Sequence, residues 1–237
     1  MPIDCEDYLV RSPNLPSGIY PIYPPGQKPI TVYCDMKSYG GGWTVIQRRV
    51  DNTQEFYKNW NDYKSGFGEL DFNFWLGLEN IYRLTDSVNN YNMLVQLNSN
   101  DDELGLAYYE NFYLESEQTG YVLRVKPDSC GNANDSLIGH VGQRFFTYDN
   151  DTNGVYKCAS NAKGGWWYRD NAADIEACHD SNLNAYLSGT TPGTMATWKT
   201  FRGYAEPVKT TKLMIRRSPL PNVVKRKLND DCLERSC

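Results

Sequence analysis

The chain begins with short runs in which apolar and polar residues alternate between turns. SGIYPIYPPGQKPITVYCDM places β-branched and aromatic residues between the turn signals PSG and PPG, and GGGWTVIQRRV follows as a glycine turn that leads into a strand. Alternation of this kind, bounded by Gly and Pro, is typical of short strands joined by tight turns. Residues 5–48 are therefore predicted to form a compact, β-rich unit.

The next section changes from helical to strand spacing. In DYKSGFGELDFNFWLGLENIYRLT, the positions of Phe74, Leu78 and Ile81 after turn glycines predict a short helix. The runs NMLVQLNS, GLAYYENFYLESE and GYVLRVK come next, and in the second run Phe112 and Leu114 alternate with other residues. A period of two is the spacing of a strand, so these runs predict an antiparallel sheet with short connections.

Regular patterning ends between residues 126 and 203. This section consists of Gly- and Asn-rich polar stretches that contain Trp166, Trp167 and Trp198. Loops of such length inside a domain are usually functional or disordered, and the tryptophans and cysteines favour function. KTTKLMIRRS then returns to strand spacing, and the chain after it is predicted to be an unstructured extension. The whole pattern indicates one α+β unit with a functional end built from loops.

Composition and charge narrow the range of partners. The 18 Tyr, 6 Trp and 8 Phe suit a fold whose irregular loops are pinned by rings, because each ring buries a large apolar area. A net charge of -5 argues against a nucleic-acid partner, which usually calls for a basic face. No run of about 18 apolar residues occurs, so no membrane span is expected.

The cysteines indicate an oxidising compartment. None of them forms a CxxC or CxxH pair of zinc-site spacing, so disulfides are favoured over zinc. Two glycosylation sequons, at Asn134 and Asn150, agree with secretion. The N-terminal residues lack the apolar segment of a signal peptide, which suggests a removed leader or an excised part of a longer chain. The seven cysteines are Cys5, Cys34, Cys130, Cys158, Cys178, Cys232 and Cys237. The odd count leaves at least one thiol free or intermolecular, and Cys237 is the best placed for it.

The stretch FFTYDNDTNGVYKC resembles the start of a calcium loop. Asp149, Asp151 and Asn153 stand at alternate positions before Gly154, and calcium prefers several oxygen ligands from one tight loop. An EF-hand would need Glu at its twelfth position, where this chain has Ser160. A smaller calcium loop and a plain Asx-rich turn both remain open at this point.

Catalytic motifs are scarce. The neighbouring Cys178 and His179 could suggest a thiol nucleophile, but a disulfide with a structural histidine is the favoured interpretation. GGWWYRD, which includes Tyr168, suits either stacking on a sugar ring or anchoring of a loop. GxSxG, HExxH, P-loop and GxGxxG motifs do not occur. The chain is therefore predicted not to be an enzyme.

Several segments together resemble a known family. DC, PSGIYPIYPP, VYCDM, GGGWTVIQRR, FYKNWNDYKSGFGELDFNFWLGLENIYRLT, FFTYDND, GGWWY and CHDSNLNAYL are similar to the fibrinogen C-terminal domain, also called the fibrinogen-related domain, of ficolins, tachylectins, angiopoietins and fibrinogen. The resemblance covers residues 4–217 and implies an α+β domain. Its three subregions would be a β-rich N-terminal part over about 4–48, a central antiparallel sheet with helices over 49–125, and a loop-rich calcium and ligand region over 126–217. Residues 218–237 would be a C-terminal extension.

The resemblance also implies disulfides and a calcium site. The family pairing would join Cys5 to Cys34 and Cys158 to Cys178, and we expect Cys130 to pair with the C-terminal segment. Family calcium sites use two acidic side chains and two backbone carbonyls. Carried over by position, the ligands here would be Asp151 and Asn153, with Asp149 in support and a carbonyl near Val155. Asn153 stands where the family has Asp, and the loop is one residue shorter.

A ligand pocket beside the calcium loop is implied as well. In acetyl-binding members it includes a cis peptide before the Cys of the CH pair, which here would join Ala177 to Cys178, together with His179 and nearby aromatic rings. Ala162 stands where the family has one such ring. The candidate aromatic residues here are Tyr168 and, depending on the alignment, Phe201 or Tyr204. The segment before Cys178 carries an insertion, DNAADIEA.

The resemblance leads to two functional hypotheses. The first is a secreted, calcium-dependent, pattern-recognition lectin of innate immunity that binds carbohydrates or acetylated groups on microbes and oligomerises in the full-length protein. The alternative is a protein-binding module of the angiopoietin or fibrinogen type, in which the same loops bind a receptor or a peptide.

Overall fold

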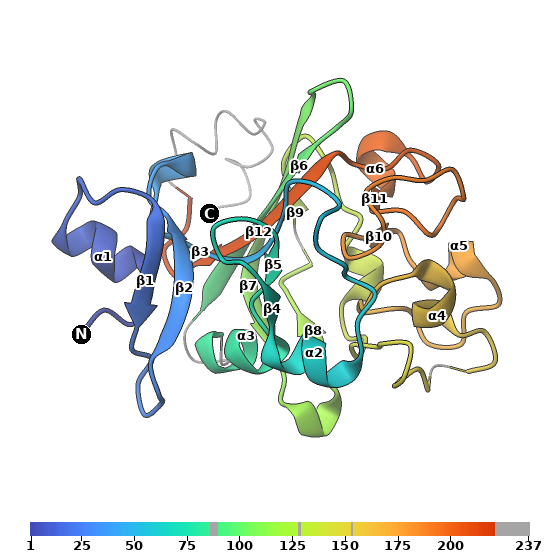
Figure 1. Cartoon of the computed structure of the whole chain (residues 1–237), viewed down its shortest axis with the longest axis horizontal. Helices are drawn as coiled ribbons and strands as arrows, with labels where there is room; N and C mark the ends of the chain where they lie inside the picture. The colour runs from blue at the N-terminus through green and yellow to red at the C-terminus, as the bar shows by residue number, and fades with distance from the viewer. Residues whose placement is uncertain (86–89, 128, 153, 221–237) are drawn as a thin grey trace.

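An antiparallel sheet runs through the molecule (Figure 1). The computed structural model describes residues 1–85, 90–127, 129–152 and 154–220. The strand order in the sheet is β1-β2-β3-β12-β6-β7-β8, with β5 beside β3, β4 beside β5 and β9 beside β7. The strands are β1 (Gly18–Ile22), β2 (Ile30–Asp35), β3 (Trp43–Arg49), β4 (Phe67–Gly68), β5 (Phe74–Trp75), β6 (Tyr91–Asn98), β7 (Leu104–Leu114), β8 (Leu123–Arg124), β9 (Ser129–Cys130) and β12 (Thr210–Arg216).

The N-terminal part contains β1, β2 and a helix that the sequence pattern did not predict. Helix α1 (Cys5–Arg11) begins where the Asp4 carboxylate accepts a hydrogen bond from the Asp7 amide at 3.1 Å. An acceptor at this position satisfies an amide that has no partner within the helix. A disulfide from Cys5 to Cys34 ties α1 to β2. The β-rich prediction for residues 5–48 is therefore correct for the strands and wrong for α1.

The predicted helix at Phe74, Leu78 and Ile81 begins later than expected. Phe74 lies in β5, which pairs with β3, and helix α3 (Leu78–Leu84) starts only after Gly77. Gly77 has a φ of 103°, and a Cβ there would lie 2.8 Å from the Ser65 carbonyl. The pairing with β3 and this sharp turn override the helical spacing of Phe74. Helix α2 (Trp60–Ser65) precedes α3.

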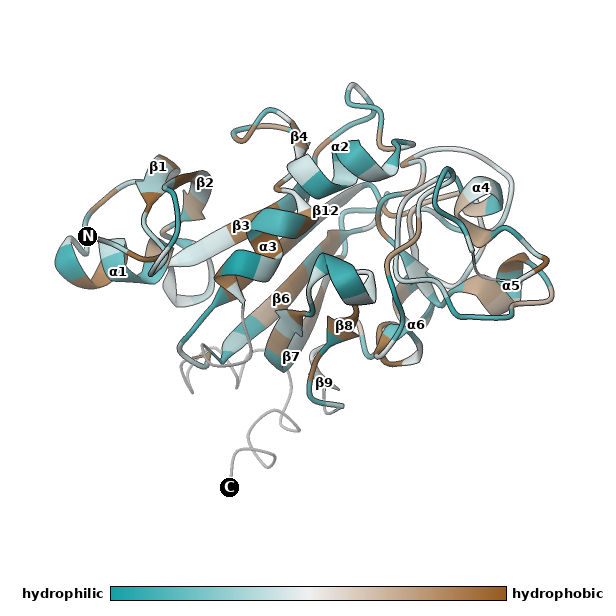
Figure 2. Cartoon of the chain, turned by 90° about the horizontal axis from the view of Figure 1, so that it is seen from below, coloured by the Kyte–Doolittle hydropathy of each residue, from teal (hydrophilic) through white to brown (hydrophobic). Residues whose placement is uncertain are grey.

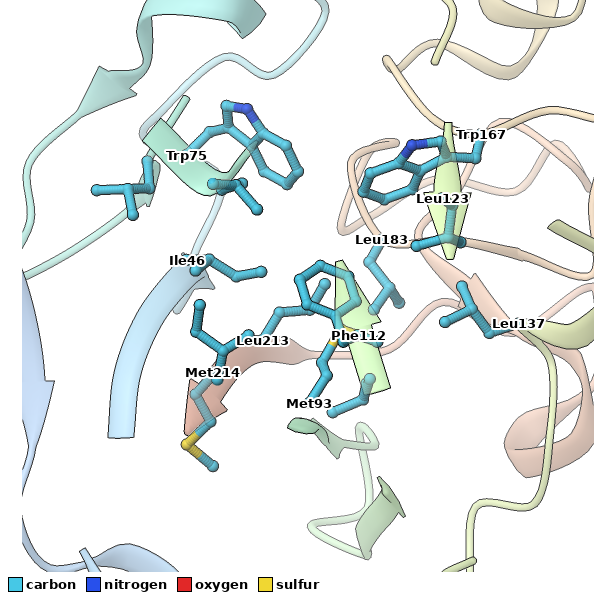
Figure 3. Close-up of a cluster of buried hydrophobic side chains, with 14 of the residues drawn as sticks. Ile46, Trp75, Met93, Phe112, Leu123, Leu137, Trp167, Leu183, Leu213 and Met214 are labelled. Atoms are coloured by element: carbon cyan, nitrogen blue, oxygen red, sulfur yellow. The ribbon is translucent and has the colours of Figure 1, made fainter. Parts of the chain in front are cut away.

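Strand β12 joins the two halves of the sheet, although it lies near the end of the described chain. It pairs with β3 on one side and β6 on the other, and Leu213, Met214 and Ile215 are buried. Figure 3 shows Leu213 and Met214 among the side chains of Ile46, Phe112 and Met93, with Trp167 and Leu183 continuing the cluster toward the loop region. One core therefore supports both the sheet and the loops.

The helices show the expected division into buried and exposed faces. Leu78, Ile81 and Leu84 of α3 are buried, whereas Glu79 and Arg83 are half-buried and form an ion pair. In Figure 2 the ribbon of α3 carries both hydrophilic and hydrophobic segments, in agreement with this pattern. The predicted strands NMLVQLNS and GLAYYENFYLESE are confirmed as β6 and β7, but GYVLRVK forms only the short β8.

The region after residue 126 is built from short elements. They are the 3-10 turn η3 (Ile138–His140), α4 (Cys158–Ala162), α5 (Ile175–Cys178), β10 (Ser181–Asn182), β11 (Thr197–Trp198) and α6 (Lys199–Arg202). Two further 3-10 turns, η1 (Ser38–Gly40) and η2 (Glu117–Thr119), lie earlier in the chain. The predicted α+β class is confirmed.

Two polar residues of β3 fasten this loop region to the sheet. The Gln47 side-chain amide donates to the Leu183 carbonyl at 3.1 Å, and the Arg49 guanidinium donates to the carbonyls of Leu183 and Ala185. Arg49 is buried, and burial lowers its pKa to about 10. Charge-assisted hydrogen bonds in a buried site are strong, so β3 fixes the position of the loops around residue 184.

Candidate functional site

Buried aromatic side chains anchor the loop region. Trp166, Trp167 and Tyr168 are all buried. The Trp167 indole donates to the Tyr121 carbonyl at 2.9 Å, and the Tyr168 hydroxyl donates to the Gly164 carbonyl at 2.6 Å. Of the two interpretations left open for GGWWYRD, the structure favours loop anchoring over stacking on a sugar at the surface.

His140 is a structural centre that the sequence did not reveal. Its Nδ1 lies 2.7 Å from the Trp167 carbonyl, and its Nε2 accepts hydrogen bonds from the Asp180 and Ser181 amides, both at 3.2 Å. Nδ1 therefore carries the proton and the ring is neutral. Burial lowers the pKa of His140 to about 4. The neutral ring holds the segment that follows Cys178 against the segment that contains Trp167.

The disulfides agree with the family pairing. Cys5 is bonded to Cys34, and Cys158 is bonded to Cys178. The second bridge joins the first residue of α4 to the last residue of α5. A disulfide sulfur is not a nucleophilic thiolate, so the bridge removes the thiol chemistry considered for Cys178. Cys130 is also disulfide-bonded, and its predicted partner in the C-terminal segment lies outside the described residues.

The cis peptide expected between Ala177 and Cys178 is absent, since every peptide bond of the described chain is trans. A capped helical turn occupies this position instead. Asp174 caps α5 by accepting from the Ala177 amide at 2.8 Å, and Ile175–Cys178 continue as a helical turn. An α-helix is built from trans peptide units, so the helical turn specifies the trans form here.

Three of the predicted ligand-binding residues lie together. The His179 ring stacks on Tyr204 at 5.2 Å between ring centroids and meets Tyr168 edge-on at 5.8 Å. The His179 Nε2 lies 3.2 Å from the Gly193 carbonyl and 3.3 Å from the Tyr204 hydroxyl. That hydroxyl donates to the Ile175 carbonyl at 2.6 Å. Burial lowers the pKa of His179 to about 3, so the ring is neutral.

The remaining predicted residues are arranged differently. Phe201 lies against Gly105 of β7, where a Cβ would come within 2.9 Å of its ring. It is therefore part of the packing between α6 and the sheet, and no described ring contact joins it to His179. Ala177 is half-buried at the end of α5, beside the disulfide.

Acidic residues border the half-buried Tyr204. Asp174 and Glu176 are exposed on α5 and its cap. Burial raises the pKa of Tyr204, and the nearby Glu176, Tyr156 and Asp174 raise it further. This surface, which we call the Tyr204 rim, consists of Tyr204, Asp174, Glu176 and Tyr156. It combines an aromatic ring with negative charge, a combination suited to a basic group on a partner.

The carboxylates of the expected calcium loop already accept hydrogen bonds. Asp149 accepts from the Thr147 hydroxyl at 2.7 Å and from the Trp60 amide at 3.0 Å. Asp151 accepts from the Ala159 amide in α4 at 2.8 Å. Both carboxylates therefore hold neighbouring backbone in place.

Two backbone carbonyls of this loop accept hydrogen bonds from a lysine side chain. The ammonium group of Lys157 lies 2.8 Å from the Asp151 carbonyl and 3.1 Å from the Gly154 carbonyl. Val155 is fully exposed, and Asn153 lies outside the described residues. Among the residues that the structure describes, no group of three His, Cys, Asp or Glu side chains could hold a metal. The calcium ligand set that the resemblance implied stays a prediction, since Asn153, one of its side-chain ligands, is not among the described residues.

Within the described ranges, no helix is both long and apolar enough to cross a bilayer.

Comparisons with known proteins agree with this fold. The family model for the fibrinogen beta and gamma chains, C-terminal globular domain, matches residues 1–218. Microfibril-associated glycoprotein 4 from Bos taurus is 36% identical over 228 residues, covering 92% of this chain and 86% of that protein. Tenascin-R from Homo sapiens is 36% identical over 218 residues, covering 91% of this chain but only 15% of tenascin-R.

Solved structures of fibrinogen-like domains are also similar to this fold. The fibrinogen-like globe domain of human ANGPTL2 superposes with a TM-score of 0.83 at 39% identity, covering 92% of this chain and 100% of that chain. Lamprey fibrin D-dimer in complex with the peptide Gly-His-Arg-Pro-amide superposes with a TM-score of 0.77 at 28% identity, covering 90% of this chain and 72% of that chain. The relatives named here do not bear the names of enzymes. The chain belongs to the family of fibrinogen C-terminal globular domains.

Proposed function

We propose that this domain is an extracellular recognition module that binds a protein or peptide through the Tyr204 rim. The observation that carries the proposal is the stacked pair of Tyr204 and His179 next to the carboxylates of Asp174 and Glu176. Aromatic side chains supply much of the binding energy at protein interfaces, and carboxylates select basic partners.

The architecture suits binding rather than catalysis. His140 and His179 are buried and neutral, and Cys178 is in a disulfide. These groups hold loops in place and have no proton or thiolate to offer near neutral pH. A rigid scaffold with exposed loops is a common arrangement for recognition.

Related proteins support an extracellular protein partner. One relative is named as a microfibril-associated glycoprotein, and the lamprey fibrin structure holds a peptide with a free amino end and an arginine. The disulfides of this chain also favour an oxidising compartment. We therefore expect a secreted domain whose ligand presents a basic segment.

The test is a peptide-display selection on immobilised domain. We expect enrichment of peptides that carry a basic residue or a basic amino end, and at least a tenfold loss of affinity in Tyr204→Ala. Tyr23→Ala, which changes a half-buried tyrosine of the N-terminal part, is the matched control and keeps full affinity. Equal affinity in both variants would place the binding surface elsewhere.

A lectin is the second candidate, and it is supported by the proximity of three of the candidate ligand residues, Tyr168, His179 and Tyr204. In that case the ligands are glycans or acetylated groups on microbial surfaces, and clustering of domains strengthens binding. A glycan array with an oligomerised domain, in calcium and in chelator, separates the candidates. Signal that free N-acetyl compounds remove supports the lectin, whereas peptide binding that persists in their excess supports the protein module.

A further inference from the structure

A lysine occupies the expected calcium loop. The Lys157 ammonium donates to the Asp151 carbonyl at 2.8 Å and to the Gly154 carbonyl at 3.1 Å. These carbonyls belong to residues three apart in the chain, and a single cation between them draws the turn closed. Backbone carbonyl oxygens are also typical ligands of calcium, so a metal ion and an ammonium group would compete for them.

One carboxylate oxygen of each acid in the loop accepts a backbone hydrogen bond. Asp151 accepts from the Ala159 amide in α4, and Asp149 accepts from the Trp60 amide at the start of α2. These bonds link the loop to both helices. Calcium prefers six to eight oxygens, roughly, and binds more tightly as ligand charge increases. From Asp149 to Cys158 the chain offers two carboxylates and one ammonium group, which is little charge for a divalent ion.

We propose that the ammonium group of Lys157 is the built-in cation of this loop and that the loop keeps its shape without calcium. The lysine lies three to six residues along the chain from the carbonyls that it contacts. It is therefore always available to them, and the loop needs no ion from solution. Recognition through the neighbouring Cys158–Cys178 segment then does not require a metal. The proposal holds whichever partner the domain binds.

Thermal unfolding of the domain tests the proposal. The proteins are the wild type, Lys157→Met, which keeps the aliphatic stem, and Lys209→Met as control. The Lys209 substitution also removes one charge, but the partner of Lys209 is the exposed Asp102 in the turn between β6 and β7. Each protein is unfolded in calcium chloride and in EDTA.

The expected results differ for the three proteins. The wild type has the same Tm in calcium and in EDTA. Lys157→Met unfolds about 2–4 °C lower in both, the shift that loss of one charged hydrogen-bonding group produces in a domain of this size. Lys209→Met stays close to the wild type, because exposed ion pairs contribute little. A calcium-dependent rise in the wild-type Tm, or an unchanged Tm in Lys157→Met, would overturn the proposal.

A double variant tests whether lysine and metal use the same oxygens. Asn153→Asp together with Lys157→Met restores the third alternate acid of the loop and removes the ammonium group. We expect this variant to gain a Tm rise in calcium and tyrosine-sensitised terbium luminescence that the wild type lacks. If the variant remains indifferent to both ions, Lys157 does not stand in the place of a metal.

Discussion

The imidazole of His179 lies face to face with the ring of Tyr204, with centroids 5.2 Å apart and planes inclined by 29°. The Tyr204 hydroxyl extends past the imidazole to the Ile175 carbonyl, so the tyrosine joins α5 to the segment after α6. This pair is the centre of the proposed recognition surface. It also keeps the imidazole out of water.

Removal of the Tyr204 ring is predicted to change the titration of His179. In Tyr204→Ala the imidazole gains access to solvent, so its pKa rises from about 3 toward the ordinary value. NMR titration of the His179 ring protons measures this rise. His140 is the internal control, since it contacts Trp167 rather than Tyr204 and keeps its low pKa. An unchanged His179 pKa would mean that other groups exclude water from it.

Stability is predicted to fall in mild acid. The folded-state pKa values of His140, about 4, and His179, about 3, lie below the ordinary value of about 6.5. The unfolded chain therefore binds protons first, and stability that is complete above pH of about 6.5 is lost as the pH falls toward 4. Each histidine contributes a slope of at most about 1.4 kcal/mol per pH unit.

Urea unfolding at a series of pH values measures this loss. His140→Gln is the informative variant, because an amide can still donate to the Trp167 carbonyl but does not titrate. We expect a shallower dependence on pH in this variant. The same slope in both proteins would show that His140 does not take part.

The two described disulfides are predicted to affect different functions. Breaking either one by a double alanine change lowers the free energy of unfolding by about 2–4 kcal/mol. Loss of the Cys158–Cys178 bridge also releases α4 from α5 beside the Tyr204 rim, so peptide binding disappears. Loss of the Cys5–Cys34 bridge leaves binding intact, because that bridge lies in the N-terminal part. Chemical unfolding and the peptide assay together check both effects.

Asp4 is predicted to be the most sensitive residue of the N-terminal part. Its buried carboxylate caps α1, accepts from the Tyr91 hydroxyl at 2.8 Å and pairs with Arg217 at 2.5 Å. Asp4→Ala leaves these partners unsatisfied and is expected to lower the free energy of unfolding by about 3–5 kcal/mol. Asp101→Ala, which removes an exposed ion pair with Arg202, serves as the control and costs less than about 1 kcal/mol. Equal losses would contradict the role assigned to Asp4.

Local patterns were sufficient to predict several elements. The short apolar runs of β6, β7 and β12 indicated strands, and in β7 Phe112 and Leu114 also alternate with less buried residues. The combination of motifs such as GGGWTVIQRR and CHDSNLNAYL indicated the family, the disulfides and the α+β class. Tyr168, His179 and Tyr204, which lie together, were among the candidate ligand residues, but so was Phe201, which packs against Gly105 instead.

Other features were decided only by tertiary contacts. Phe74 has helical spacing but pairs with β3, and β12 lies between β3 and β6, a choice of neighbours that no local period records. Helix α5 has too few residues to be stable alone, so its Asp174 cap and the Cys178 bridge determine it and its trans peptide bonds.

The calcium loop shows the same division most clearly. The sequence by itself determined where acidic residues alternate, and it placed Lys157 one residue before Cys158. Only the folded chain decided that the carboxylates turn to backbone amides and that the ammonium group turns to two carbonyls. The physical reason is that the backbone turns of a loop set the directions of its carboxylates and carbonyls, and so decide which groups they can bind. In this loop those directions depend on the hydrogen bonds to α2 and α4.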